Sequence, residues 1–282
     1  LHQMKKILFP TAYAAHSKVA FRYTQKLAQY FEASITLVHI YESPTSTLTS
    51  TGALISEELK YFAEQQWDKE MTKLKSFADE LNSKQYHQIK LDFIATDGDV
   101  VGQLLDIQME NDFDLIVMGT KRHHTFDRIF GNTTYSLIDE ITCPLLLIPP
   151  DAHFIHLDKI LYGTAFKTGE VKTIEYLLDW CLAFGSTLNL LHVHGKENAS
   201  YALTKMAELT ETFEREKKAE IVTANLIEGK ISSILDQYIK STGVDLLAIH
   251  RRKKGLLQEM TDGSLTKTLS EEIQIPLLVL KS

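Results

Sequence analysis

The chain has 282 residues, of which 44% are hydrophobic and 24% charged, and its formal net charge is −7. This composition is ordinary for a soluble globular protein, and the length suits two domains. The acidic net charge argues against broad nucleic-acid binding, which needs a basic face, and the sequence predicts no membrane span because no run of 18 apolar residues occurs.

In chain order, short apolar runs alternate with amphipathic stretches of helical period through the first half of the sequence. The strands are expected over residues 7–10, 34–41, 88–96, 115–118 and 145–148, and the helices over 18–31, 56–81, 100–110 and about 133–141. Apolar strands that alternate with helices predict a parallel sheet covered by helices on both faces.

The second half of the sequence repeats the first. Residues 6–12 read KILFPTA and residues 159–165 read KILYGTA, while DLIVM at 114–118 returns as DLLAI at 245–249. Strands are therefore expected again near 159–162, 187–193, 220–226, 245–249 and 277–280. Two copies of one fold follow from this pattern, and we expect domains over 4–150 and 157–282 with a linker over 151–156.

The spacing between matching blocks falls from 153 to 131 after the second strand. The first copy therefore carries a longer loop and second helix, roughly over residues 42–85. The aromatic residues of this helix, Tyr61, Phe62, Trp67 and Phe77, are expected to serve the core or a partner helix.

The cysteines and histidines offer little chemistry on their own. Cys143 and Cys181 form no CxxC pair and look like small buried apolar residues, which suits a reducing cytoplasm. His192 and His194 share one face of a strand end, a spacing that some metal sites use, but no carboxylate or cysteine joins them nearby. We therefore predict no metal site. No P-loop, G-x-G-x-x-G or G-x-S-x-G motif occurs.

Taken together, the first strand ending in Pro-Thr, the second ending in Leu-Val-His, the run DLIVMGT and the run CPLLLIP resemble the universal stress protein family. The resemblance covers essentially the whole chain as a tandem pair. It implies an α/β fold with two Rossmann-like (adenine nucleotide alpha hydrolase-like) domains, each a five-stranded parallel sheet with helices on both faces. It also implies that the fifth strands, Leu145 to Ile148 and Leu277 to Leu280, pair within the chain as an internal pseudo-dimer, and that a further homodimer can form.

Nucleotide-binding members of this family carry an Asp just after strand one and a G-x2-G-x9-G-[S/T] loop after strand four. Glycines let backbone amides approach the phosphates, and the next helix N-terminus favours negative charge. Here the Asp positions are Ala12 and Ala165. The first loop keeps its outer glycines but has Arg122 at the second, and the second loop begins with His250, so both loops are degenerate.

Positive side chains appear where these glycines are lost. They either replace backbone amides as anion ligands or simply form solvated loops, and both interpretations stay open. The candidate nucleotide- or anion-binding residues are Thr11, Ala12, His39, Gly119, Lys121, Arg122, Gly131, Asn132, Thr133, Lys253, Gly263 and Ser264.

Three hypotheses for function follow. The first is a non-catalytic cytoplasmic protein of the stress response that binds a small ligand or a partner protein, without a cofactor, a membrane or nucleic acid. The second is an ATP-binding member that uses the first domain, with slow hydrolysis. The third is a carrier of another small anion or of an apolar ligand in the same cleft.

Overall fold

The computed structural model describes residues 4–43, 56–82, 88–120, 137, 140–154, 156–166, 169–215, 221–251 and 275–281. The first half contains β1 (Lys6–Pro10), α1 (Ala15–Phe31), β2 (Ser34–Tyr41), α3 (Glu57–Leu81), β3 (Leu91–Asp97), α4 (Val100–Glu110), β4 (Leu115–Gly119) and β5 (Leu145–Ile148). The second half contains β6 (Lys159–Gly163), α7 (Glu170–Phe184), β7 (Thr187–His194), the 3₁₀ turn η2 (Lys196–Asn198), α8 (Ala199–Arg215), β8 (Val222–Glu228), α9 (Ile231–Thr242), β9 (Leu246–Arg251) and β10 (Leu277–Lys281).

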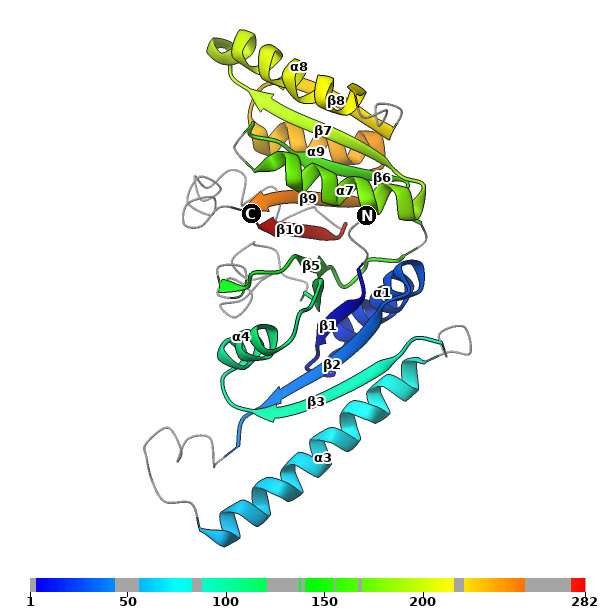
Figure 1. Cartoon of the computed structure of the whole chain (residues 1–282), viewed down its shortest axis with the longest axis vertical. Helices are drawn as coiled ribbons and strands as arrows, with labels where there is room; N and C mark the ends of the chain where they lie inside the picture. Colours follow the sequence, from blue (N-terminus) through cyan, green and yellow to red (C-terminus); the bar gives the residue numbers. More distant parts are fainter. Residues whose placement is uncertain are drawn as a thin grey trace.

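All described strands form one ten-stranded sheet in the order β3-β2-β1-β4-β5-β10-β9-β6-β7-β8. Within each half the neighbouring strands are parallel, and the halves join where β5 and β10 pair antiparallel, with Leu146 opposite Leu278. The elements therefore stack along the length of the molecule in Figure 1. The predicted α/β fold with a parallel five-stranded sheet in each half is confirmed.

The core lies on both faces of this sheet. On one face, side chains of α1, α3, α7 and α8 pack against alternate strand residues, and on the other face α4 and α9 do the same. All four residues of β5 are buried, as expected for a strand that is covered on both faces at the centre of a sheet.

Several predicted element bounds are wrong by a few residues. The third strand begins at Leu91 and not at residue 88, because residues 88 and 89 form a turn. The first helix begins earlier than predicted, at Ala15, directly after the turn that ends β1. Of the helix expected at about 133–141, only Leu137 and Glu140 are described as helical.

An aromatic cluster, which we call the seam, holds α1 against α7. The ring of Tyr30 lies 5.9 Å from Phe154 and 4.6 Å from Phe184, and the ring of Phe31 lies 5.4 Å from Trp180. Phe154 follows β5, whereas Trp180 and Phe184 belong to α7, so the seam joins the two halves a second time.

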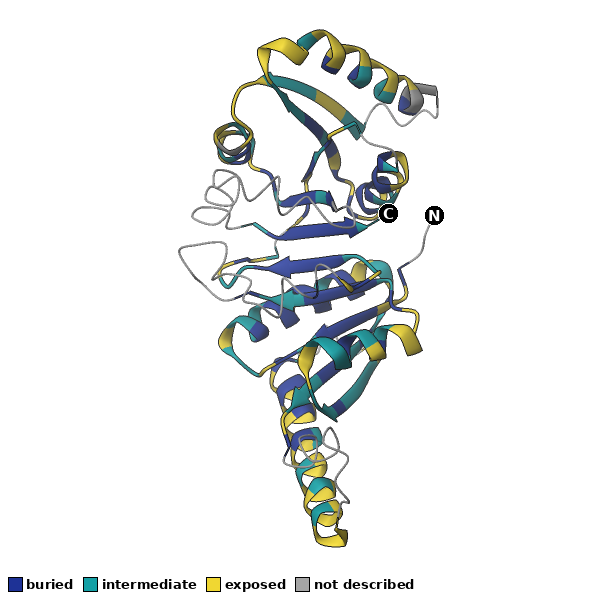
Figure 2. Cartoon of the chain, turned by 90° about the vertical axis from the view of Figure 1, so that its left-hand side faces the viewer, coloured by how far each residue is buried: buried dark blue, intermediate teal, exposed yellow. Residues whose placement is uncertain are grey.

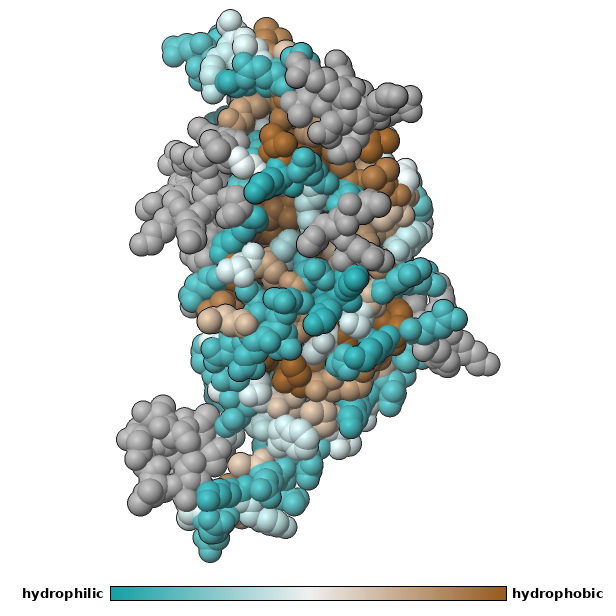
Figure 3. Space-filling view, viewed as in Figure 1, coloured by the Kyte–Doolittle hydropathy of each residue, from teal (hydrophilic) through white to brown (hydrophobic). Residues whose placement is uncertain are grey.

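Helix α3 is longer than the sheet face that it covers, and its first half projects beyond the sheet (Figures 1 and 2). Its buried residues all lie in its second half, from Glu70 to Leu81. The expected core role holds for Phe77 but is wrong for Tyr61 and Phe62, which are exposed. The surface where α3 projects, at the lower end of Figure 3, is mainly hydrophilic. None of the described helices is both long and apolar enough to cross a membrane.

Candidate functional site

The candidate site lies at the carboxyl ends of β1 and β2, where the chain turns sharply toward α1. The Thr11 N–H donates to the Val38 carbonyl (2.9 Å), which extends the β1–β2 ladder by one residue. The Tyr13 N–H then donates back to Thr11 Oγ1 (3.1 Å), and Tyr13 takes a positive φ of 60°. A left-handed non-glycine residue is uncommon, and here it places the Tyr13 ring over the strand ends.

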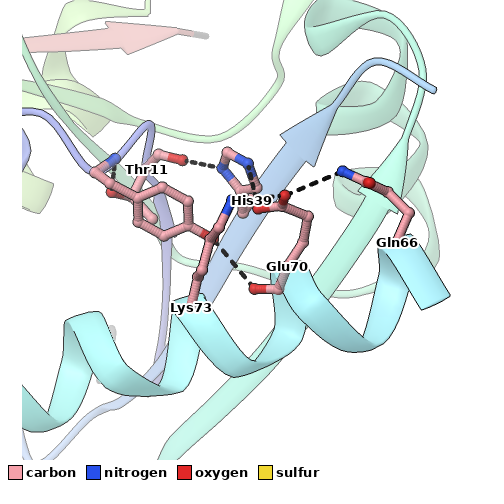
Figure 4. Close-up of polar contacts among 6 residues, drawn as sticks. Thr11, His39, Gln66, Glu70 and Lys73 are labelled. Carbon is pink, nitrogen blue, oxygen red and sulfur yellow. Dashed lines mark hydrogen bonds and ion pairs between the residues drawn. The ribbon is translucent and has the colours of Figure 1, made fainter.

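His39, near the end of β2, is fixed by this turn. Its Nδ1 donates to the Thr11 carbonyl oxygen (2.8 Å), and its ring centroid lies 4.3 Å from that of Tyr13. A carbonyl oxygen can only accept, so Nδ1 carries the hydrogen. The other nitrogen, Nε2, therefore faces α3 (Figure 4).

Glu70 of α3 brings a buried carboxylate to this point. Its Oε1 accepts from Lys73 Nζ (2.8 Å) and from Gln66 Nε2 (3.1 Å), and its Oε2 lies 3.6 Å from His39 Nε2. Tyr13 Oη donates to the Glu70 backbone carbonyl (3.3 Å). The cationic and amide donors compensate the burial of the charge.

Burial and the nearby Glu70 charge together raise the pKa of the Tyr13 phenol above its ordinary value, with burial the larger cause. The phenol therefore stays protonated and remains a donor to the Glu70 backbone. Sequence reasoning did not identify Tyr13 or Glu70 as site residues. A signal was present for Glu70, since an acid stands in the apolar stripe of α3 one turn before Leu74.

The second half contains the same turn. The Thr164 N–H donates to the Leu191 carbonyl (2.9 Å), the Phe166 N–H donates to Thr164 Oγ1 (3.1 Å), and Phe166 has a φ of 55°. His192 Nδ1 donates to the Thr164 carbonyl (2.8 Å) under the Phe166 ring, at 4.1 Å. Burial is the main reason that the pKa of His192 is lowered.

The two halves differ in what lies across the end of the first strand. In the second half, the buried Glu170 carboxylate accepts from Thr164 Oγ1 and from the Ala165 N–H (3.1 Å). The matching residue of the first half, 153 positions earlier, is Ser17. Among the described residues, none accepts a hydrogen bond from the Ala12 N–H, and Ala12 is exposed.

The ends of β4 and β9 differ in a related way. A Cβ placed on Gly119 would lie 2.6 Å from the His16 carbonyl oxygen, so β4 and α1 approach closely enough to require glycine there. The matching residue of β9 is His250, which is buried and whose Nδ1 lies 2.7 Å from Thr173 Oγ1 on α7. Within the described structure, Gly119 is therefore a packing glycine.

Of the predicted site residues, the structure places Thr11, Ala12, His39 and Gly119 at the carboxyl ends of three neighbouring strands, β1, β2 and β4. The other eight predicted residues lie outside the described residues: Lys121, Arg122, Gly131, Asn132, Thr133, Lys253, Gly263 and Ser264. Over the described ranges, no group of three or more His, Cys, Asp or Glu side chains is arranged to hold a metal ion.

Known proteins resemble this chain in sequence pattern and in fold. The model of the universal stress protein family matches residues 4–149 and again 156–281. A universal stress protein from Archaeoglobus fulgidus has a similar structure, with a TM-score of 0.71, 16% sequence identity and coverage of 99% of both chains. A functionally unknown protein from Pseudomonas aeruginosa is similar with a TM-score of 0.63 and 16% identity, over 99% of this chain and 92% of that one. No curated protein sequence matches the chain.

Proposed function

Because the chain belongs to the universal stress protein family, we propose that it acts by binding a small ligand and not by catalysis. The ligand site is the carboxyl edge of the first half, around Thr11, Ala12 and His39. Open α/β sheets usually bind ligands outside the carboxyl ends of their strands. The second half serves mainly as a structural partner.

The contrast between Ala12 and Ala165 carries this proposal. Both residues lie in the turn after the first strand of their half, but among the described residues only the Ala165 N–H is taken by a side chain. The exposed Ala12 N–H is a ready donor for an acceptor atom of a ligand. The Tyr13 ring beside it offers an apolar face.

The side chains around this edge are held in place by one another. His39 Nδ1 is held by the Thr11 carbonyl, and the Glu70 carboxylate is held by Lys73 and Gln66. Satisfied polar networks of this kind rigidify the structure around them, and an edge of fixed shape suits ligand binding.

ATP binding through the first half is the second candidate function. It is favoured by Gly119, which keeps the first glycine of the family loop at the end of β4. The substituted Ala12 and Arg122 positions favour weakened nucleotide binding, so we propose that the first half binds one ATP, with lower affinity than its preferred ligand.

Native mass spectrometry of the purified full chain tests the proposal, followed by calorimetric titration with ATP, with AMP and with any ligand that co-purifies. We expect one ligand per chain, lost in Ala12→Trp because the indole would cover the strand ends. The matched variant Ala165→Trp, in the second half, should bind as wild type does.

Two results would contradict the proposal. In one, Ala165→Trp abolishes binding while Ala12→Trp does not. In the other, the wild type turns ATP into ADP and Ala12→Trp stops the reaction, which would mean that the first half is an enzyme site.

A further inference from the structure

The structure points to a built-in occupant of the second half: we propose that the Glu170 carboxylate fills the ligand position there and excludes anionic ligands from it. This inference rests on the proposed function for the location of the ligand edge. The group that Glu170 imitates is an anionic oxygen, such as a carboxylate or a phosphate, that accepts from a backbone amide and a hydroxyl.

The contacts of Glu170 are those of a bound anion. One carboxylate oxygen accepts from the Ala165 N–H (3.1 Å) and the other from Thr164 Oγ1, and only 4% of the residue is exposed. Glu170 is also the first residue of α7, where the partial positive charge of the helix start favours a carboxylate.

The internal repeat shows that the two edges differ at one matching position, which is Ser17 in the first half and Glu170 in the second. From Thr11 and Thr164 through the left-handed helix ends at Glu32 and Gly185, matching residues keep a constant separation. Ser17 and Glu170 stand at matching places in that frame, and both are 4% exposed. A serine side chain is too short to span the strand end as the glutamate does.

A second substitution closes the neighbouring strand end. His250 takes the place of Gly119, and its imidazole pairs with Thr173 of α7, where the first half has Ala20. The two additions lie one helical turn apart on α7, because Glu170 and Thr173 are three residues apart. Both fill the carboxyl edge of the second half with its own side chains.

An intramolecular carboxylate competes at a high effective concentration, since it never leaves the site. A free anion would have to displace it and take over the Ala165 N–H and the Thr164 hydroxyl, and removing donors from a buried carboxylate is costly. Among the described residues, the carboxyl edge of the first half is then the open one of the two edges that the fold contains.

The direct test is Glu170→Ser, which gives the second half the residue that the first half has. In calorimetric titration with ATP, the number of ligands bound per chain should rise twofold, from one to two. Glu170→Gln is the matched control, because glutamine keeps the length and can still accept from Ala165, so its stoichiometry should stay at one.

The NMR signal of the Ala165 amide shows whether the second ligand binds at the strand end of the second half. In Glu170→Ser its NMR resonance should shift on addition of ATP, whereas in the wild type it should not move. If Glu170→Ser keeps the wild-type circular dichroism but shows an unchanged stoichiometry and an unmoved Ala165 resonance, the inference is wrong.

The reciprocal variant Ser17→Glu decides the question if Glu170→Ser does not fold. It should abolish ATP binding in the first half, and retained binding would overturn the inference. The two proposals also fail separately. If the wild type binds no ATP and Glu170→Ser binds one, the open edge of the first half is not the site, but the occupant role of Glu170 stands.

Discussion

His39 and His192 occupy matching positions in the two halves but have different surroundings. His39 and His192 both donate from Nδ1 to the threonine carbonyl at the end of the first strand of their half, at 2.8 Å. Beyond that shared bond, His39 Nε2 faces Glu70, whereas the ring of His192 stacks 6.4 Å from that of His194. At His192, burial and the second imidazole disfavour the charged form of the ring.

A prediction about pH follows for His192. Burial is the main cause that holds its pKa below the ordinary value of 6.5, so the folded state binds fewer protons than the unfolded state. Stability from this residue is complete above pH 6.5 and is lost as the pH falls through the lowered pKa. Urea unfolding at pH 7.5 and pH 5.5 should show a smaller loss for His192→Asn than for the wild type. An equal loss in both proteins would contradict the assignment.

Among the elements, α1 and α7 match in place and differ in how closely they approach the sheet. α1 passes so near the end of β4 that Gly119 has no room for a side chain, whereas α7 leaves space for His250 beside Thr173. The close approach brings the start of α1 toward the open edge around Ala12. The glycine of the first half is thus explained by packing between two elements.

Gly119→Ala tests that explanation. The added Cβ would meet backbone at 2.6 Å, which a side-chain rearrangement cannot relieve. We expect a loss of about 1–3 kcal/mol in the free energy of unfolding, measured with urea. Gly163→Ala is the matched control at the end of β6, where nothing lies within 4 Å of the new Cβ. Equal stability of the two variants would show that β4 and α1 are not in close contact.

At the scale of the whole molecule, the halves share one sheet and one core. The β5–β10 pairing runs the sheet through the centre, and the cluster of buried side chains that includes Phe21 and Trp180 contains residues of both halves. The seam adds aromatic contacts between α1 and α7. We therefore expect the two halves to unfold together.

Phe184→Ala should weaken the packing between the two halves. Phe184 is 4% exposed and contacts aromatic rings of both halves, including Tyr30 and Trp180. Its truncation is expected to cost about 3–5 kcal/mol and to split the single thermal transition in calorimetry. Leu182→Ala, on the same helix but 58% exposed, should stay within about 0.5 kcal/mol of the wild type. A wild-type profile for Phe184→Ala would contradict a structural role for the seam.

The sequence by itself determined the strand and helix order and the duplication. Apolar strands must be buried on both faces, and a repeat of blocks repeats the fold. Local sequence also sets the starts of two helices, where Ser56 accepts from the Leu59 N–H and Asp99 from the Gly102 N–H. These features depend on residues that are close in the chain.

Only the tertiary structure decided how the two edges differ. Ala12 and Ala165 occupy matching positions in the sequence, and neither supplies the acid that the family resemblance implies there. Folding returns a carboxylate to each half from another element, Glu70 from α3 and Glu170 from α7, in different positions. Glu70 reaches His39 from a distant part of the chain, so no local pattern encodes that contact. Glu170 lies only five positions from Ala165, but the folded turn and the start of α7 decide that its carboxylate points back to the strand end. Among the described residues, the Ala165 N–H has a side-chain acceptor and the Ala12 N–H has none.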